Sequence, residues 1–248
     1  MNKHIKDIIK SVARKFYIEL RKYSPESSDV ARMQRIFSHH KIDLVLDVGA
    51  NVGQYARHLR EFGYRGKIVS FEPLSSAHSK LIAASKKDPL WEVAPRTAIG
   101  NRDGNIKINI AKNSFSSSAL PILDSHLNAA PESAYIDSEI VDLHKLDSIA
   151  PRYIEGHAKS TYLKVDVQGF ESQVLEGAAG LLQKIKGVQL ELSLVPLYEG
   201  EPLFRDMLDK LDQFGYDLYA VIPGFTDMKS GRLLQLDGIF FRRQHIML

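Results

Sequence analysis

The feature that most constrains the fold of this chain is a short segment in which an apolar run leads into a glycine-containing loop. Residues 44–55 read Leu-Val-Leu-Asp-Val-Gly-Ala-Asn-Val-Gly-Gln-Tyr, and residues 67–73 read Lys-Ile-Val-Ser-Phe-Glu-Pro. The first segment predicts a strand, a tight loop and the start of a helix, and the second predicts a strand that ends on Glu72. This arrangement is typical of nucleoside-binding α/β units.

The residue types in the loop indicate which cofactor it would bind. A dinucleotide fingerprint, G-x-G-x-x-G, has three glycines so that the backbone can approach a pyrophosphate. Here Gly49 and Gly53 flank Asn51, which takes the place of the second glycine, and Asp47 precedes the loop. A carboxylate there would repel a pyrophosphate and attract an ammonium group, and Glu72 is suited to the two hydroxyls of a ribose. The loop therefore favours S-adenosylmethionine over NAD.

A structural interpretation of the same loop stays open at this point. Gly49 and Gly53 could simply allow a tight turn, and Asp47 could cap the following helix. The correctly spaced Glu72 favours a cofactor site over this alternative.

The remaining pattern predicts a mostly parallel sheet, because apolar runs alternate with helical periodicity from residue 42 onward. We expect strands at 44–48, 67–71, 91–98, 162–167, 188–194, 216–222 and 236–241, and helices at 53–62, 75–87, 171–185 and 202–214. The turn residues 100–104 and the alternating Ile106, Ile108 and Ile110 indicate an antiparallel pair inserted into this pattern, where a substrate pocket could be built.

Four motifs in this order resemble the FkbM family of S-adenosylmethionine-dependent methyltransferases. They are Asp47-Val-Gly-Ala-Asn-Val-Gly-Gln-Tyr55, Phe71-Glu72-Pro73, Ser116-Ser-Ser-Ala-Leu120 and Leu163-Lys-Val-Asp-Val-Gln-Gly-Phe-Glu171. The similarity spans roughly residues 42 to 243. It implies the α/β, Rossmann-like fold of class I methyltransferases, with a mostly parallel seven-stranded sheet and helices on both faces. It also implies O-methylation of a hydroxyl on a sugar, glycolipid, polyketide or related small metabolite.

The motifs supply the residues that we expect to bind the methyl donor. These are Asp47, Gly49, Asn51, Gly53, Tyr55, Glu72, Ser117 and Asp166. The loop that holds Ser117 lies in a region, 113–131, without clear periodicity, so its hydroxyls could face a ligand or only solvent.

Asp166 is the first choice for catalysis. It lies at the end of the strand 162–167, on the same side as Lys164, and the carboxyl ends of parallel strands form the ligand crevice. The family usually has a glutamate where this chain has Gln168, and glutamine can act neither as a base nor as a charged metal ligand. Glu191, an acid within an apolar strand, and His144 are further candidates to take a proton from an alcohol.

A divalent cation such as Mg²⁺, held by Asp166, Glu191 and a further oxygen, could also lower the pKa of an acceptor hydroxyl. His144 could instead be an inert residue of a surface helix. Because of Gln168, a non-catalytic nucleoside-binding module with the same fold is the alternative function. An NAD-dependent oxidoreductase is disfavoured by Asn51 and Asp47.

The N-terminal segment carries most of the basic character. Residues 1–22 hold seven Lys or Arg against Asp7 and Glu19, which gives +5 and leaves −2 for the rest of the chain. Apolar residues from Ile5 to Tyr23 recur at helical spacing and predict a basic amphipathic helix, followed by a second helix at 29–39. We therefore expect a helical extension, residues 1–41, ahead of the methyltransferase domain, residues 42–248.

This extension could pack on the domain as a lid, form a homodimer, or contact a membrane surface or lipid-linked substrate through residues 1–23. A nucleic-acid partner is not expected, because no other basic patch with interleaved aromatic residues occurs. The chain has no cysteine, no run of about 18 apolar residues and no pattern of a secretory signal. We expect a cytoplasmic protein that is either free or peripheral to the membrane.

Overall fold

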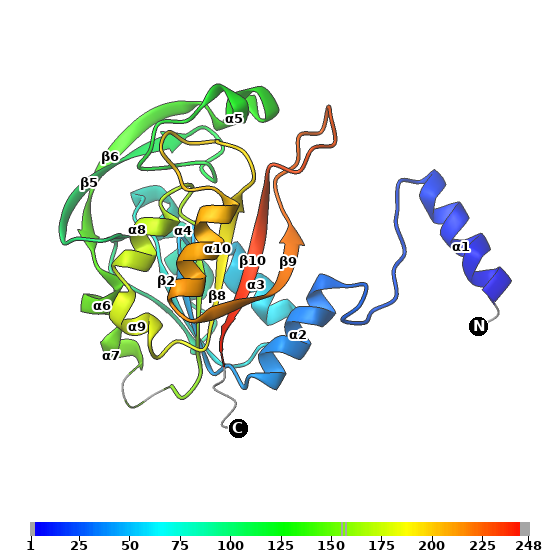
Figure 1. The fold of residues 1–248 in the computed structure, drawn as a ribbon, viewed down its shortest axis with the longest axis horizontal. Helices are drawn as coiled ribbons and strands as arrows, with labels where there is room; N and C mark the ends of the chain where they lie inside the picture. Colours follow the sequence, from blue (N-terminus) through cyan, green and yellow to red (C-terminus); the bar gives the residue numbers. More distant parts are fainter. Residues whose placement is uncertain (1–2, 155, 157, 244–248) are drawn as a thin grey trace. The chain divides into compact units, whose positions relative to one another are not determined.

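The computed structural model describes residues 3–154, 156 and 158–243. The chain divides into two compact units, Met1–His39 and His40–Leu248 (Figure 1). The suggested roles of the N-terminal extension, as a lid, a dimer surface or a membrane contact, stay predictions.

The N-terminal unit contains helices α1 (Lys3–Lys15) and α2 (Asp29–His39). The second helix lies where it was predicted, but the first one is shorter, and its predicted continuation to Tyr23 is wrong. Tyr17 has a left-handed backbone, with φ of 58°. The amide of Ile18 turns back to the carbonyl of Ala13, which ends the helix.

The larger unit is built on a seven-stranded sheet with the order β3-β2-β1-β7-β8-β10-β9. The strands are β1 (Leu44–Val48), β2 (Lys67–Phe71), β3 (Trp91–Val93), β7 (Thr161–Val165), β8 (Gly187–Ser193), β9 (Tyr216–Pro223) and β10 (Gln235–Arg242). The first five are parallel, and β10 runs antiparallel between β8 and β9. The predicted seven-stranded, mostly parallel sheet is confirmed.

Helices cover both faces of this sheet. Successive strand residues point to opposite sides, so each strand presents side chains to both layers of helices. Leu44, Leu46 and Val48 of β1 belong to the main apolar core. That core also takes in residues of α6 (Leu146–Ile149), α7 (Pro151–Ile154), α8 (Glu171–Glu176), α9 (Ala179–Leu182) and α10 (Phe204–Gln213). The other face carries α3 (Gln54–Glu61) and α4 (Ser75–Ser85). Tyr55 of α3 reaches Gln189 of β8 on this second face.

A second, three-stranded sheet forms the insert. It contains β4 (Ala98–Ile99), β5 (Gly104–Ala111) and β6 (Tyr135–His144), with β6 in the middle. Between β5 and β6 lie α5 (Asp124–Ala129) and a 3₁₀ turn, Pro131–Ser133. The predicted antiparallel pairing of Ile106, Ile108 and Ile110 is present, and its partner is β6, which the sequence analysis did not identify as a strand.

Two predicted elements are divided in the structure. The strand expected at 91–98 is split between the two sheets, because Pro95 has no backbone N–H to continue the ladder. The helix expected at 171–185 is split into α8 and α9 around Gly177. Asp147 from α6 caps the second piece by accepting hydrogen bonds from the amides of Gly180 and Leu181, at 2.9 and 2.8 Å. Among the described residues, no helix has the length and apolar character needed to cross a bilayer.

Candidate functional site

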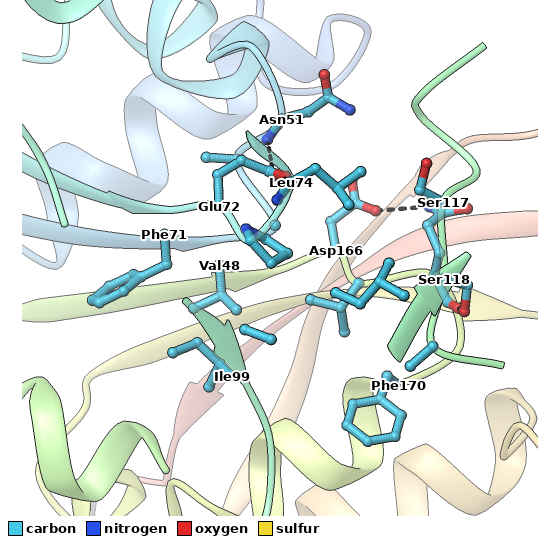
Figure 2. Close-up of a pocket in the computed structure, with 18 of the residues that line it drawn as sticks. Val48, Asn51, Phe71, Glu72, Leu74, Ile99, Ser117, Ser118, Asp166 and Phe170 are labelled. Carbon is cyan, nitrogen blue, oxygen red and sulfur yellow. Dashed lines mark hydrogen bonds between the residues drawn. The ribbon is translucent and has the colours of Figure 1, made fainter. Parts of the chain in front are cut away.

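A pocket of about 310 Å³ opens at the carboxyl ends of the parallel strands, where the three-stranded insert folds over the main sheet (Figure 2). Its lining comes from the loop after β1, from the ends of β2, β7 and β8, and from β4, β5 and β6. Most of the residues predicted from sequence line it, namely Asp47, Gly49, Asn51, Tyr55, Glu72, Ser117, Asp166 and Glu191. Gly53 and His144 are not among its lining residues.

The loop after β1 takes its shape from three left-handed residues, Gly49, Asn51 and Gly53, with φ of 81°, 49° and 85°. A side chain at Gly49 would lie 1.9 Å from the carbonyl oxygen of Asp166, so this glycine lets the loops after β1 and β7 touch. Gly53 instead packs against Trp91, and a Cβ added at Gly53 would lie 2.6 Å from the indole ring. Gly53 is therefore needed for packing against Trp91 and does not itself line the pocket.

Glu72 is held in one orientation at the end of β2. It is 4% exposed, and its two oxygens accept hydrogen bonds from the amides of Asn51 and Leu74, at 2.8 and 2.9 Å. Burial raises the pKa of Glu72 to about 7, against the lowering effect of these two bonds. The wall beside it is apolar, formed by Val48, Phe71 and Ile99 (Figure 2).

Asp47 lies at the end of β1, on the face of the sheet that carries α3. Its Oδ2 accepts a hydrogen bond from the Ser70 hydroxyl at 3.1 Å. Burial raises the pKa of Asp47 to about 7, and the ammonium of Lys164 acts in the opposite direction. Tyr55 lies close by, with its ring 5.8 Å from Lys164 Nζ and its hydroxyl donating to Gln189 Oε1 at 2.8 Å.

Lys164 and Asp166 meet on the same side of the chain, as their spacing predicted. Lys164 is 5% exposed, and its ammonium lies 3.2 Å from both Asp166 Oδ2 and Asp237 Oδ1. Burial alone would lower the pKa of Lys164, but the carboxylates of Asp166, Asp237 and Glu191 reverse this and raise it. Asp166 itself keeps 37% of its side chain exposed to the pocket side. The site therefore holds the buried ammonium of Lys164 next to the solvent-accessible side chain of Asp166.

Gln168 links the two acids proposed for catalysis. Its Nε2 donates to Asp166 Oδ1 at 2.9 Å and to Glu191 Oε2 at 2.6 Å. Its Oε1 accepts a hydrogen bond from the Tyr198 hydroxyl at 2.7 Å, which fixes the orientation of the amide. Gln235 donates to the same Glu191 oxygen at 3.0 Å. Gln168, which in the sequence indicates only the loss of a charge, thus organises this end of the pocket.

The surroundings of Glu191 favour the protonated form of its carboxyl group. Burial raises the pKa of Glu191 well above its ordinary value, and the nearby carboxylate of Asp166 adds to the shift. Glu171, the other acid of the third motif, does not line the pocket. Its Oε1 accepts a hydrogen bond from the amide of Val167 at 3.0 Å and stabilises the loop after β7.

The loop 113–118 closes the pocket from the insert side. Its serine hydroxyls bond mainly to the protein itself: Ser117 Oγ donates to the Ser114 carbonyl at 2.9 Å, and Ser118 Oγ donates to the Gln168 carbonyl at 2.5 Å. Phe115 lines the pocket and is 57% exposed. Phe115 was not predicted from the sequence, because a single phenylalanine in an aperiodic loop carries no chemical pattern.

His144 lies at the carboxyl end of β6, away from the pocket lining. Its Nδ1 lies 3.3 Å from Asp103 Oδ1 in an exposed pair. The structure thus does not bring His144 together with Asp166 and Glu191, because successive strand side chains point to opposite faces and the neighbouring Leu143 faces the pocket. Within the described ranges, no group of three or more His, Cys, Asp or Glu residues is arranged to hold a metal ion. The Mg²⁺ site at Asp166 and Glu191 stays a prediction.

Comparison with known proteins agrees with this architecture. Residues 47–218 match the family model described as the methyltransferase FkbM domain. The chain belongs to the FkbM methyltransferase family. Its sheet has the strand order and the antiparallel β10 of class I methyltransferases, so the predicted fold class is confirmed.

This FkbM methyltransferase is similar to a curated 2-O-methyltransferase. It is 28% identical over 220 residues to the 2-O-methyltransferase NoeI of Sinorhizobium fredii (strain NBRC 101917 / NGR234), and the match covers 85% of this chain and 86% of NoeI. Similar solved structures include TehB from Haemophilus influenzae, with 11% identity, 93% of this chain and 65% of that chain covered, and a TM-score of 0.47. The fibrillarin/Nop5p complex gives 15% identity, coverage of 90% and 85%, and a TM-score of 0.47.

Proposed function

We propose that this protein is an S-adenosylmethionine-dependent O-methyltransferase that acts on a hydroxyl of a sugar, glycolipid or related small metabolite. The observation that carries the proposal is the close approach of two loops in one pocket. The loop after β1 touches the backbone of Asp166 at Gly49. A methyl donor bound at the first loop would therefore lie next to the acid on the second.

The donor half of the pocket has groups suited to each part of S-adenosylmethionine. Glu72, already oriented by two amides, would accept hydrogen bonds from the ribose hydroxyls. The apolar wall of Val48, Phe71 and Ile99 suits an adenine ring. Asp47 would bind the ammonium of the amino-acid portion. When bound, the cofactor supplies a methyl group that its sulfonium already activates.

The acceptor half has to align an alcohol with that methyl group and take its proton. Asp166 is suited to this role because it is the accessible acid of the cluster and is held by both Lys164 and Gln168. Glu191, whose raised pKa favours the protonated form, would serve as a neutral hydrogen-bonding group. Lys164 would stabilise negative charge that develops on the acceptor oxygen.

Two further observations support an O-methyltransferase acting on a sugar. The similar protein NoeI is named a 2-O-methyltransferase, and polar side chains line the pocket, including Gln54, Lys164 and Gln168. The alternative is a non-catalytic nucleoside-binding module. The ordered contacts of Gln168 favour the enzyme, because the glutamine keeps both acids in place.

Calorimetry with S-adenosylmethionine, S-adenosylhomocysteine and NAD separates the proposed classes. We expect the first two to bind and NAD not to bind. Glu72→Ala should weaken donor binding about tenfold through the loss of charge-assisted hydrogen bonds. Absence of donor binding would refute the proposal.

A labelled methyl donor and a panel of sugar acceptors then test catalysis. Asp166→Asn should lower turnover by about 10²-fold or more, with unchanged donor affinity, because the proton acceptor is lost. Asp237→Asn is the matched control, since it removes the other carboxylate partner of Lys164 and should retain most activity. A fully active Asp166→Asn enzyme would exclude Asp166 as the base. Assay after chelation, then with added Mg²⁺, tests the predicted cation.

A further inference from the structure

The loop 113–118, here called the bridging loop, connects the two halves of the pocket. At one end, Asn51 Nδ2 donates to the Ser114 carbonyl at 3.2 Å, which ties the bridging loop to the glycine loop after β1. At the other end, Ser118 Oγ donates to the Gln168 carbonyl at 2.5 Å, which ties it to the loop after β7. Figure 2 shows Ser117 and Ser118 beside Asp166. An acceptor next to Asp166 would therefore lie against the bridging loop.

Internal hydrogen bonds keep the bridging loop in one conformation. Asn113 Nδ2 donates to the hydroxyls of Ser116 and Ser133, at 3.1 and 3.0 Å, and Asn113 Oδ1 accepts from the amide of Ser116 at 3.1 Å. The side chains of Ser116 and Ser118 are 7% and 1% exposed. The hydroxyls that the sequence pointed to as ligand contacts are thus largely used to build the bridging loop.

Phe115 is the side chain that the bridging loop presents to the outside. Ser114, which precedes it, has a left-handed backbone with φ of 61°. Phe115 lines the pocket, yet 57% of it is exposed. An exposed phenylalanine leaves a large apolar area in water, and on a fixed loop it has little freedom to bury that area elsewhere. Such a ring at the mouth of a pocket is suited to covering a ligand.

We propose that Phe115 is the platform on which the pyranose ring of the acceptor stacks, and that it selects cyclic sugars over acyclic polyols. The inference rests on the proposed function and deepens it. A pyranose presents C–H groups on its flat face and hydroxyls around its edge. Stacked on Phe115, the flat face would cover the aromatic ring, while the edge hydroxyls would reach the polar groups of the pocket.

The polar part of the pocket lining decides between a sugar and an aromatic acceptor. Gln54, Lys164, Asp166 and Gln168 all line the pocket. Among the described residues, Gln54 Oε1 is buried without a hydrogen-bond partner. An aromatic hydrocarbon face over this atom would leave it unsatisfied, at a cost in binding free energy. A sugar can donate a hydroxyl to Gln54 at the same time as it offers an apolar face to Phe115.

A fluorescence measurement tests the platform without depending on methyl transfer. The chain has a single tryptophan, Trp91, which is 7% exposed, so Phe115→Trp adds an exposed reporter at the proposed contact. We expect methyl β-D-glucopyranoside to shift the emission of this variant to shorter wavelength, and the acyclic glucitol to leave it unchanged. A response to catechol without a response to the pyranoside would overturn the proposal.

Kinetics on the full chain supplies the second readout. With methyl β-D-glucopyranoside as acceptor, Phe115→Ala should raise KM about tenfold, because one stacking contact is lost. Its kcat should stay within about twofold of the wild-type value, and its affinity for the methyl donor should be unchanged. Phe115→Trp should restore the wild-type KM. Ile140→Ala is the matched control, because Ile140 is 74% exposed on β6 and does not line the pocket.

The two proposals fail in different ways. If the wild-type protein methylates the pyranoside while Phe115→Ala keeps its KM and Phe115→Trp shows no emission change, the platform is refuted and the proposed function stands. If the emission of Phe115→Trp responds to the pyranoside but no acceptor is methylated, the platform stands and the proposed function is refuted.

Discussion

At the scale of single residues, the site depends on polar groups that are buried in pairs. Lys164 is balanced by Asp166 and Asp237, and Glu191 is held by the amides of Gln168 and Gln235. A buried charge or carboxyl group without such partners would destabilise the fold by several kcal/mol. These contacts explain how the neighbouring strands β7, β8 and β10 can bring several ionisable groups together and still keep a defined geometry.

Gln168→Glu tests this network directly. The substitution keeps the shape of the side chain but replaces an amide that donates to both Asp166 and Glu191 by a third carboxyl group. We expect kcat to fall about tenfold or more through lost hydrogen bonds, each about 1 kcal/mol, with donor affinity measured by calorimetry nearly unchanged. Gln235→Ala, which removes a donor to Glu191 but none to Asp166, should have the smaller effect. Equal kcat values for Gln168→Glu and wild type would contradict the positioning role.

Gly53→Ala should reduce stability through packing. The added Cβ would lie 2.6 Å from the Trp91 ring on a residue with φ of 85°. Gly63 offers a matched control, since its φ is 96° but no atom lies within 4 Å of the added Cβ. Backbone strain alone costs about 1–2 kcal/mol, so Gly63→Ala should lower the melting temperature by a few degrees. Gly53→Ala should lower it clearly further, and equal effects would show that Trp91 can yield without cost.

At the scale of elements, the insert between β3 and β7 completes the pocket that the main sheet begins. The sheet supplies Asp47, Glu72 and Asp166 at strand ends, whereas the three-stranded insert supplies Ile106, Ile108 and the bridging loop. Parallel strands place their carboxyl ends at one edge, so the donor half follows from the sheet alone. The acceptor half depends on how the insert folds over that edge.

Asn113→Ala tests the order of the bridging loop. The variant loses the three hydrogen bonds that Asn113 makes to Ser116 and Ser133. We expect faster amide hydrogen exchange within residues 113–118 and an acceptor KM raised about threefold to tenfold, with donor binding preserved. Asn105→Ala removes one hydrogen bond, to Asp142, within the three-stranded insert but away from the bridging loop. It should leave the exchange rates and the acceptor KM unchanged. Unaltered exchange in Asn113→Ala would mean that other contacts order the bridging loop.

At the scale of the whole molecule, buried carboxyl groups connect the site to stability. Burial raises the pKa of Asp47, Glu72 and Glu171 to about 7 each. These groups titrate near pH 4 in an unfolded chain, so between these values the folded state binds more protons than the unfolded state. Their contribution to stability is present below about pH 4 and is lost as the pH rises through 7. His126, whose pKa burial lowers to about 4, acts in the opposite direction in the same window.

The three carboxyl groups outnumber the histidine, so the melting temperature of the ligand-free protein should fall by several degrees between about pH 5.5 and 8. Differential scanning fluorimetry measures this change. Glu171→Gln keeps the hydrogen-bond acceptor for the amide of Val167 but removes the titrating group, and it should make the fall smaller. A melting temperature that rises over this range would contradict the raised pKa values of these carboxyl groups.

Much of the architecture follows from the sequence by itself. The alternation of apolar runs and helical periodicity predicted the seven strands of the main sheet, and the spacing of Asp47, Gly49 and Glu72 predicted where a nucleoside would bind. These features are local, because strand faces and tight turns are set by neighbouring residues. The strand β6 was missed because only part of it alternates: Val141 and Leu143 are buried, whereas Ile136 and Ile140 are exposed.

The acceptor side was decided only by the tertiary structure. Sequence placed His144 among the candidates for the base, and the fold puts it in a surface pair with Asp103. The proposed roles of Gln168 and Phe115 depend on contacts between segments far apart in the chain. Gln168 contacts Glu191 and Tyr198. The bridging loop, which carries Phe115, is bonded to Asn51. Local sequence patterns determine which strand ends carry acids, but the distances between those acids depend on loops that pack together only in the folded chain.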